Sequence, residues 1–351
     1  MLLSARVYDR QVGGNTRYVR SVYERIEQFG VRFTLGRPPL ADTSARLRSA
    51  LYAGSESVYW PVRSSRRYTA LHFPADTGAI VRGKVPIVGT IHGLATLHME
   101  GVRTPRADSL WRSRVRKLAR VSDRVITVSQ SSADDIAFFE PTVADRISVI
   151  HHGIDHDRFN TTRRGDFAAT QARLGVPSDY FLYVGNLDPR KNIVALANAA
   201  QRVFRATGIP LVVSGSPAWD SEDSLKAVES NEGVLYVGRT SDDDMISLLQ
   251  NTLAFCFPSL YEGFGFPVLE AMACGAPVIC SDRGSLGEVA GQASLMLADV
   301  DDASIADAML SLIEEPRERA RLRELGIANA AKFQWSESAA MHADVFREVG
   351  R

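Results

Sequence analysis

Short runs of apolar residues recur along the chain and alternate with longer stretches in which apolar positions follow helical spacing. Uninterrupted, β-branched runs of this kind are typical of strands that are buried on both faces of a sheet. Several of them lead through Gly, Ser or Asp directly into an amphipathic stretch, which indicates βα units and parallel sheets covered by helices. The predicted strands are Val85–Ile91, Arg124–Val128, Ile147–Ile150, Tyr180–Val184, Leu211–Ser214, Val234–Val237, Ala254–Phe257 and Pro277–Cys280.

One polar and charged stretch, residues 157–178, separates two series of strands and helices. We therefore predict an α/β protein with a Rossmann-like, doubly wound domain over residues 1–160, a linker over 161–178 and a second such domain over 179–335. The last helix is expected to start at a Ser cap after Trp335 and to pack, over residues 336–351, on the first domain. Ligands of such domains bind at the carboxyl ends of the strands, so the default site is the cleft between the domains.

Composition excludes several classes of protein. The 41 basic residues balance the 41 acidic ones, so no global field attracts nucleic acid. Cys256, Cys274 and Cys280 lie in or beside apolar runs and form no CxxC pair, as expected of core residues in a reducing compartment. We expect neither a signal peptide nor a membrane span, because Arg6 interrupts the start and no apolar run approaches roughly 18 residues. The expected location is the cytoplasm, at most on the inner face of a membrane.

The segment after the predicted strand Ala254–Phe257 has the composition of an anion-binding loop. Gly263 and Gly265 precede Pro267, and proline is favoured at the first position of a helix because its missing N–H would be unpaired there anyway. A helix that starts behind such a loop presents backbone N–H groups at the positive end of its dipole. The third glycine of a dinucleotide fingerprint is missing at the required spacing, which argues against that kind of site.

Two carboxylates flank this helix start, with seven residues between them. Glu262 lies in the loop and Glu270 near the beginning of the helix. If the phosphates of an elongated ligand lie at the helix start, these acids are placed to hold hydroxyl-bearing groups on either side. For Glu270 the alternative is a charge that only complements the helix dipole.

A second loop, residues 183–192, follows the predicted strand Tyr180–Val184 and carries the adjacent cations Arg190 and Lys191. Lys191 is conspicuous because only five of the 41 basic residues are lysines. Two cations at this place would stabilise negative charge on a bound ligand without a metal. The alternative is a solvated pair on a surface loop.

The run PSLYEGFGFPVLEAMACGAPVICS, residues 258–281, closely resembles the E-x7-E signature of the retaining glycosyltransferases of family 4, which have the GT-B fold. The resemblance implies that Glu270 binds the ribose of a nucleotide-sugar and that Glu262 and the loop backbone face the sugar and the diphosphate. The loop with Arg190 and Lys191 resembles the diphosphate-binding loop of this family, although Asn186 stands where many relatives have a basic residue. The donor-binding residues implied in this half are Gly185, Asn186, Arg239, Gly263, Phe264, Gly265, Val268, Leu269 and Glu270.

The first half carries two further candidates. Gly13 and Gly14 precede a predicted helix, where they either let a ligand approach the backbone or only form a tight turn. The resemblance favours the first interpretation, because family members have a glycine pair there. His92 ends the predicted strand Val85–Ile91, and the segment resembles a family loop whose histidine contacts the transferred sugar. A structural histidine is the alternative, and Gly93 replaces the usual acidic residue of that loop.

The helix predicted around residues 111–121 has one apolar face and one basic face. The basic face is either simply solvated or in contact with anionic lipid head groups, as expected of an enzyme with a lipid-linked acceptor.

Taken with the resemblance, these features imply a GT-B hexosyltransferase, with mannosyl transfer preferred over other sugars. Its donor would be a GDP- or UDP-hexose, its acceptor a glycan or lipid-linked glycan, and neither a metal nor another cofactor is expected. The predicted catalytic residues are His92, Arg190, Lys191 and Glu262. The alternatives are a GT-B epimerase and a non-catalytic partner of a true transferase.

Overall fold

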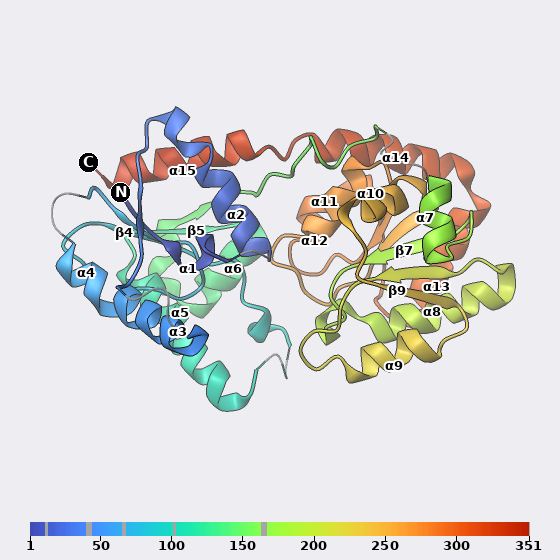
Figure 1. Ribbon diagram of the computed structural model, residues 1–351, viewed down its shortest axis with the longest axis horizontal. Coiled ribbons are helices and arrows are strands. Elements are labelled where there is room, and N and C mark those ends of the chain that lie inside the picture. Colours follow the sequence, from blue (N-terminus) through green and yellow to red (C-terminus); the bar gives the residue numbers. More distant parts are fainter. Residues whose placement is uncertain are drawn as a thin grey trace. The chain divides into compact units, whose positions relative to one another are not determined.

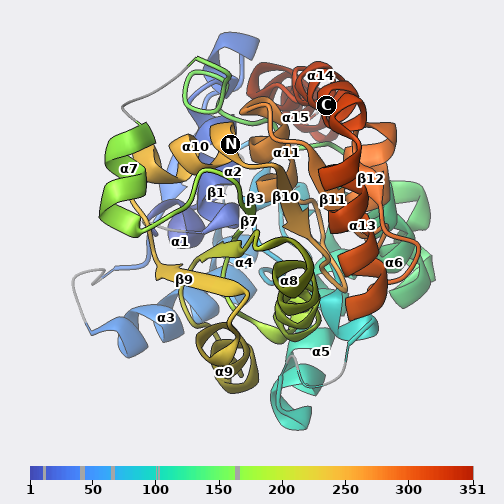
Figure 2. The same cartoon turned by 90° about the vertical axis from the view of Figure 1, so that its right-hand side faces the viewer.

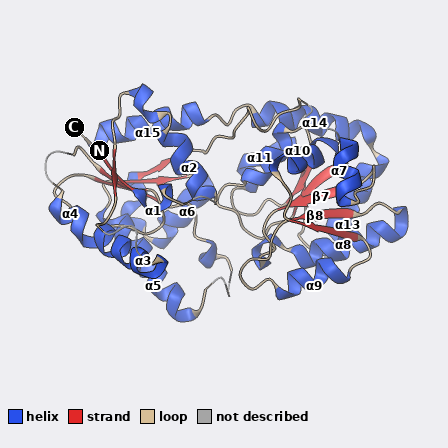
Figure 3. Ribbon diagram, viewed as in Figure 1, coloured by secondary structure: helices blue, strands red, loops and turns tan. Residues whose placement is uncertain are grey.

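The computed structural model describes residues 1–10, 13–39, 44–64, 68–99, 101, 103–162 and 167–350 (Figure 1). The chain forms two compact units. The first contains Met1–Gly153 together with Gln334–Arg351, and the second contains Ile154–Phe333. The predicted α/β class is confirmed, because each unit is built on a parallel sheet of six strands with helices on both sides (Figure 3).

The sheet of the first unit has the strand order β2-β1-β3-β4-β5-β6, and all its pairs are parallel. The order reverses between β1 and β3, which makes this pair the topological switch point of the unit. The strands are β1 (Leu2–Ser4), β2 (Thr34–Gly36), β3 (Leu71–Phe73), β4 (Ile87–Thr90), β5 (Arg124–Thr127) and β6 (Ile147–Val149).

The two faces of this sheet pack against different helices. Leu71 and Phe73 of β3 belong to a core that includes Tyr52 and Leu118, on the side of α3, α4 and α5. His72, between them, points to the opposite side, because side chains alternate along a strand, and there it meets α2 and α15. The helices are α1 (Ala5–Tyr8), α2 (Gly14–Tyr23), α3 (Ala45–Gly54), α4 (Trp60–Arg63), α5 (Pro105–Val121), α6 (Gln130–Phe139) and α15 (Trp335–Val349).

The second unit has the strand order β12-β11-β10-β7-β8-β9, again entirely parallel. In sequence order this is 6-5-4-1-2-3, the arrangement of a dinucleotide-binding sheet, and its switch point lies between β7 and β10. The strands are β7 (Phe181–Val184), β8 (Leu211–Ser214), β9 (Val234–Gly238), β10 (Ala254–Phe257), β11 (Val278–Cys280) and β12 (Leu295–Met296).

Helices α8, α9 and α13 cover one face of the second sheet, and α10, α11 and α14 cover the other (Figures 2 and 3). The three cysteines are buried in this unit as free thiols. The helices are α7 (Phe167–Leu174), α8 (Ile193–Thr207), α9 (Glu222–Ser230), α10 (Asp242–Asn251), α11 (Phe266–Ala273), α12 (Leu286–Ala290), α13 (Asp302–Glu314) and α14 (Pro316–Ala330).

The structure differs from the predicted boundaries at two places. Part of the predicted linker 161–178 forms α7, because Thr170 and Arg173 bond to Asp244 of α10 and so tie the helix to the second unit. The linker also includes residues 163–166, which lie outside the described ranges. The first unit ends at Gly153 rather than at residue 160, since the Ile154 N–H already donates to the carbonyl of Phe333 at the other end of the second unit.

The last helix, α15, lies in the first unit, where it contacts α2. It starts at Trp335 and not at the expected Ser cap; Gln334 precedes it without a side-chain cap. Trp335 is buried against the His152 ring, 5.6 Å away between centroids, which fixes the first turn by packing instead of capping. Within the described residues, no helix is both long and apolar enough to span a membrane.

Candidate functional site

Two loops meet at the switch point of the second unit, one after β7 and the other after β10. The Leu260 N–H donates to the carbonyl of Arg190 at 2.8 Å, and the Arg190 guanidinium donates to the carbonyl of Tyr261 at 3.0 Å. The first loop also packs closely on the residue after β8, since a Cβ on Gly215 would lie 1.8 Å from the carbonyl oxygen of Gly185. Strand order alone therefore brings together segments that lie some 70 residues apart in the chain.

The centre of these loops is a buried ion cluster. Lys191 Nζ lies 2.5 Å from one carboxylate oxygen of Glu262, and an Arg190 Nη1 lies 3.0 Å from the other. Asp188 faces Arg190 at 3.6 Å. Lys191 also lies over the ring of Phe257, 4.6 Å from its centroid. The structure thus joins three of the four residues predicted to be catalytic.

Burial and charge act in opposite directions on these groups. Burial raises the pKa of Glu262, but Lys191 and Arg190 lower it by more, so the carboxylate is ionised well into the acid range. Burial lowers the pKa of Lys191, and the attraction of Glu262 only partly offsets this. Burial also raises the pKa of Asp188, against the pull of the two cations. The cluster contains two cations and two carboxylates, and its charges largely cancel before any ligand binds.

Glu270 lies in α11, which begins behind Gly265 at a φ of +104°, a backbone conformation that favours glycine. Pro267 occupies the first turn as predicted. The Glu270 side chain is almost entirely buried, although it stands near the start of the helix. Burial of this degree is unusual for a carboxylate that only complements a dipole.

The remaining predicted donor-binding residues divide into two groups. Asn186 and Arg239 are exposed at the carboxyl ends of β7 and β9, on the same edge of the sheet as Glu262. Val268 and Leu269 are fully buried, and Phe264 packs on the rings of Phe266 and Phe333. These three side chains belong to the core, so their predicted role can apply only to their backbone.

Sequence reasoning did not single out Asp188, although it stands in the loop that carries Arg190 and Lys191. A buried carboxylate directly before Pro189 and two cations is a signal that could have been used. Tyr183 was also missed; its hydroxyl donates to the carbonyl of Asn186 at 2.8 Å and so fixes the loop from within the strand.

In the first unit, Gly13 precedes α2 at a φ of +109°, so this position needs glycine for the turn itself, and Gly14 is the first helical residue. His92 stands just past β4 and is partly buried. Its N–H donates to an oxygen of Asp76 at 2.8 Å, and its Nε2 lies 3.3 Å from the carbonyl of Pro74. Burial lowers the pKa of His92, and Asp76 only partly offsets the effect, so the ring is neutral near pH 7.

Behind His92 runs a chain of buried hydrogen bonds. The Tyr18 ring makes an edge contact with the His92 ring, 5.0 Å between centroids. The Tyr18 hydroxyl lies 2.8 Å from His342 Nε2 and 3.1 Å from Thr90 Oγ1. Thr90 Oγ1 lies 2.8 Å from His72 Nε2, and His72 Nδ1 lies 2.5 Å from the hydroxyl of Tyr23. We call this set the buried polar chain of the first unit.

Every proton in this chain has an assignable place. His342 Nδ1 faces the carbonyl of Ser338 at 2.7 Å and must donate to it, which leaves Nε2 to accept from Tyr18. Tyr18 then accepts from Thr90, Thr90 accepts from His72, and His72 accepts from Tyr23. This order needs both histidines neutral, and burial lowers the pKa of His342 to about 4 and that of His72 well below its usual value.

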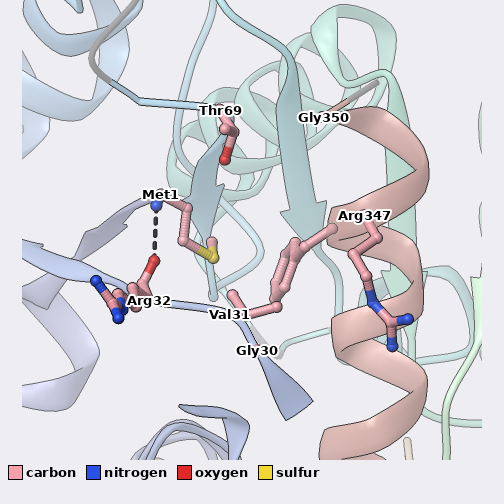
Figure 4. A pocket seen from close by; sticks show the side chains of 8 residues that line it. Met1, Gly30, Val31, Arg32, Thr69, Arg347 and Gly350 are labelled. Atoms are coloured by element: carbon pink, nitrogen blue, oxygen red, sulfur yellow. Dashed lines mark hydrogen bonds between the residues drawn. The ribbon is translucent and has the colours of Figure 1, made fainter.

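A cavity of about 630 Å³ lies at the opposite, amino edge of the same sheet (Figure 4). The terminal amine of Met1 donates to the carbonyl of Arg32, and both residues line this cavity. Its lining contains no predicted site residue and consists of Met1, Gly30, Val31, Arg32, Thr69, Phe346, Arg347 and Gly350. Among the described residues, no group of three or more His, Cys, Asp or Glu is arranged to hold a metal ion.

Comparison with protein families assigns both halves of the chain. Residues 169–328 match the family "Glycosyl transferases group 1", and residues 12–158 match "Glycosyltransferase Family 4". The two matches fall on the second and the first unit, respectively.

Individual relatives agree with these families. The chain is 32% identical over 228 residues to O-antigen chain mannosyltransferase B of Escherichia coli, covering 64% of this chain and 60% of that protein. It is also 32% identical over 284 residues to glycogen synthase of Mycobacterium tuberculosis, covering 76% and 64%. The chain thus spans about three fifths of the length of these curated relatives.

The fold has solved counterparts. Sucrose-phosphate synthase from Thermosynechococcus elongatus superposes with a TM-score of 0.75 and 19% sequence identity, covering 99% of this chain and 98% of that one. A likeness at this identity concerns the fold, and it confirms the predicted GT-B class.

Proposed function

Since the chain belongs to the group 1 and family 4 glycosyltransferases, we propose that it transfers a hexosyl group, preferably mannosyl, from a nucleoside-diphosphate sugar to a glycan or lipid-linked glycan. The observation that carries this proposal is the buried cluster of Arg190, Lys191 and Glu262 at the switch point of the second unit. The mannosyl preference is supported by the similarity to a mannosyltransferase.

The reaction would proceed with retention. The bond between the anomeric carbon and the diphosphate oxygen breaks, and the acceptor oxygen bonds to this carbon from the same face. The acceptor proton passes to the departing diphosphate oxygen. The charge that develops on this oxygen needs a fixed cation nearby, and preorganised charges are worth about 10²–10³ in rate.

Arg190 is the cation best placed to meet the diphosphate. Its side chain keeps 23% exposure, whereas that of Lys191 keeps 9%. Its 3.6 Å contact with Asp188 is long for an ion pair and is readily exchanged for a phosphate oxygen. Lys191 and Glu262 fix the position of the Arg190 side chain and set the net charge around it. With two cations in place the reaction would need no metal, so activity is expected to survive excess EDTA.

The test is a donor screen with GDP- and UDP-hexoses. A bound donor at 100 times its dissociation constant raises the unfolding free energy by about 2.7 kcal/mol, which thermal denaturation detects. Turnover is then followed by release of the nucleoside diphosphate, with and without EDTA, and the anomeric configuration of the product by NMR. Inversion at the anomeric carbon would contradict retention, and loss of turnover that Mg²⁺ or Mn²⁺ restores would contradict the metal-free mechanism.

We further propose that the first unit contacts an anionic membrane surface at the cytoplasmic side. Arg114 of α5 donates to Ser57, so α5 lies beside the helical run 45–63. Both segments expose apolar side chains, and α5 adds six basic residues against one acid, Asp108. The exposed apolar residues are Leu47, Val58, Tyr59, Val62 and Leu110.

Sedimentation with vesicles tests this surface. The double variant Tyr59→Ser, Leu110→Ser should bind phosphatidylglycerol vesicles more weakly than the unmodified protein does. Phosphatidylcholine vesicles should bind neither the unmodified protein nor the double variant. Phe138→Ser is the matched control, because Phe138 is the most exposed large apolar residue of α6 and lies outside this surface. Equal binding of all variants would contradict the proposal.

Only two residues support the alternative that the chain is a non-catalytic partner of a true transferase. Asn186 and Gly93 leave out a basic and an acidic group that the family resemblance would place there. Turnover of the donor by the purified chain alone excludes a partner role, and release of the nucleotide with transfer to an acceptor excludes an epimerase.

A further inference from the structure

Beside His92 lies a carboxylate with no role in the mechanism above. Asp76 follows β3, and one of its oxygens accepts the backbone N–H of His92, at 2.8 Å. Among the described residues nothing donates to its other oxygen, and the side chain is only half-buried. Asp76 therefore sits at the carboxyl edge of the first sheet, next to the switch point between β1 and β3, with one oxygen available.

The turn that carries Asp76 is rigid. Arg6, after β1, donates to Thr77 at 3.3 Å and forms an ion pair with the buried Glu56 at 2.8 Å. A Cβ on Gly78 would lie 2.6 Å from the Phe73 side chain, so the turn is packed tightly on its own strand. Asp76 is held in place before any ligand binds, which lowers the entropy cost of binding.

The chemistry next to Asp76 fits a hydroxyl and does not fit an anion. His92 Nε2 faces the carbonyl of Pro74 and must donate to it, so Nδ1 of the neutral ring is an acceptor. An acceptor nitrogen and a carboxylate oxygen together repel phosphate and attract O–H groups. Gly93, which follows His92 at a φ of +139°, has no side chain of its own to add to this chemistry.

We propose that Asp76 is a hydroxyl-binding residue for a hexose in the reaction, acting beside His92. The carboxylate oxygen accepts a short, charge-assisted bond from a sugar hydroxyl. The hydroxyl belongs either to the transferred sugar of the donor or to the acceptor sugar. This inference rests on the proposed function, and the experiment separates the two sources.

The central variant is Asp76→Asn, whose amide oxygen still accepts the His92 N–H. The matched control is Asp123→Asn, because Asp123 accepts the N–H of Ile87 at 2.8 Å, at the opposite end of the same strand β4. Both variants remove the charge of a carboxylate that accepts a backbone N–H, and Asp123 also faces Arg82 at 3.7 Å. A purely structural role of Asp76 would therefore affect ligand binding no more than Asp123→Asn does. If Asp76→Asn does not fold, Asp76→Ser supplies a hydroxyl acceptor in its place.

Calorimetry with GDP-mannose and free GDP, or with the donor that the screen identifies and its nucleotide, gives the first readout. Asp76→Asn should bind the intact donor about 10- to 150-fold more weakly and the free nucleotide unchanged if the bond is to the donor sugar. If the bond is to the acceptor, donor affinity stays and the KM for the acceptor rises by a similar factor. No change in either quantity beyond that of Asp123→Asn overturns the inference. A wild-type protein that neither binds nor turns over any nucleotide-sugar overturns the proposed function itself.

Discussion

The two units bury polar side chains at their sheets in opposite ways. The second unit keeps a cluster of charged groups, in which ion pairing opposes burial: it raises the pKa of Arg190, lowers that of Glu262 and partly offsets the lowering of the pKa of Lys191. The first unit keeps a chain of neutral groups, in which the two histidines, Tyr18 and Thr90 each donate once and accept once, and Tyr23 donates to His72. In both arrangements the buried polar groups bond to one another, but only the charged cluster of the second unit carries a large cost of desolvation.

This difference separates groups that serve a ligand from groups that serve the fold. Replacing a buried ion pair by apolar residues is often neutral or stabilising, so an ionised cluster is weak evidence of a structural role. The ionised cluster of the second unit lies at the switch point of its sheet, where ligands bind in α/β sheets. The buried polar chain instead joins α15, α2 and the strands β3 and β4, and it stiffens the support of His92.

The largest effect is expected for Lys191→Met. The variant leaves Glu262 buried with one cation fewer, which costs about 3–5 kcal/mol of stability, and it removes a charge worth about 10²–10³ in turnover. Lys191→Met with Glu262→Gln removes both charges and should regain most of the stability without regaining activity. Chemical denaturation and nucleotide release measure the two quantities. Recovery of turnover in the double variant would show that the pair is structural.

The next effect concerns pH and the buried polar chain. His342 has a pKa of about 4 when folded and about 6.5 when unfolded, so between these values the unfolded chain binds more protons. Stability of the first unit should therefore fall as the pH drops from 6.5 to 4, by about 3 kcal/mol from His342 alone. The background Trp219→Phe leaves Trp60, Trp111 and Trp335 as reporters, all in the first unit.

His342→Gln in that background is the control, because glutamine does not titrate. Its stability at pH 7 will be lower, but its loss between pH 6.5 and 4 should be smaller than that of the parent. Parallel curves for the two proteins would mean that His342 contributes nothing to the acid sensitivity.

The smallest of the three effects is expected for Glu270→Gln. If Glu270 binds two ribose hydroxyls, the amide loses charge-assisted bonds worth about 1.5–3 kcal/mol, and the affinity for the free nucleoside diphosphate falls roughly 10- to 150-fold. If it only complements the dipole of α11, stability changes by at most about 1 kcal/mol and affinity stays. Calorimetric titration of the diphosphate into both proteins distinguishes these outcomes.

The sequence was most informative where strands are apolar throughout. Strands β8 and β10 are buried along their whole length and β7 along all but its last residue, and these strands follow from their composition. Strand β3 was missed because His72 interrupts its apolar pattern, and β12 because it has only two residues. Helix α7 was missed because its position depends on Thr170 and Arg173 reaching Asp244, a contact across more than 70 residues.

For the site, the sequence named Lys191 and Glu262 separately but did not pair them. Their contact follows from β7 and β10 being neighbours in the sheet, which composition does not encode. The expected open pair of cations is instead already paired with the carboxylates of Glu262 and Asp188. Asp76 was missed for the same reason, because its partner is the backbone N–H of His92, just past the neighbouring strand β4.

The place of α15 has a consequence for the order in which the protein matures on the ribosome. The second unit, Ile154–Phe333, is one continuous segment and is complete once residue 333 has emerged. The first unit begins earlier but lacks its last helix until α15 has been synthesised, and the bond between Tyr18 and His342 spans 324 residues. Domains usually fold from the amino terminus onward during synthesis. Here the unit whose synthesis starts first is completed last, and until then the sheet face that packs on α2 and α15 lacks the contacts of α15.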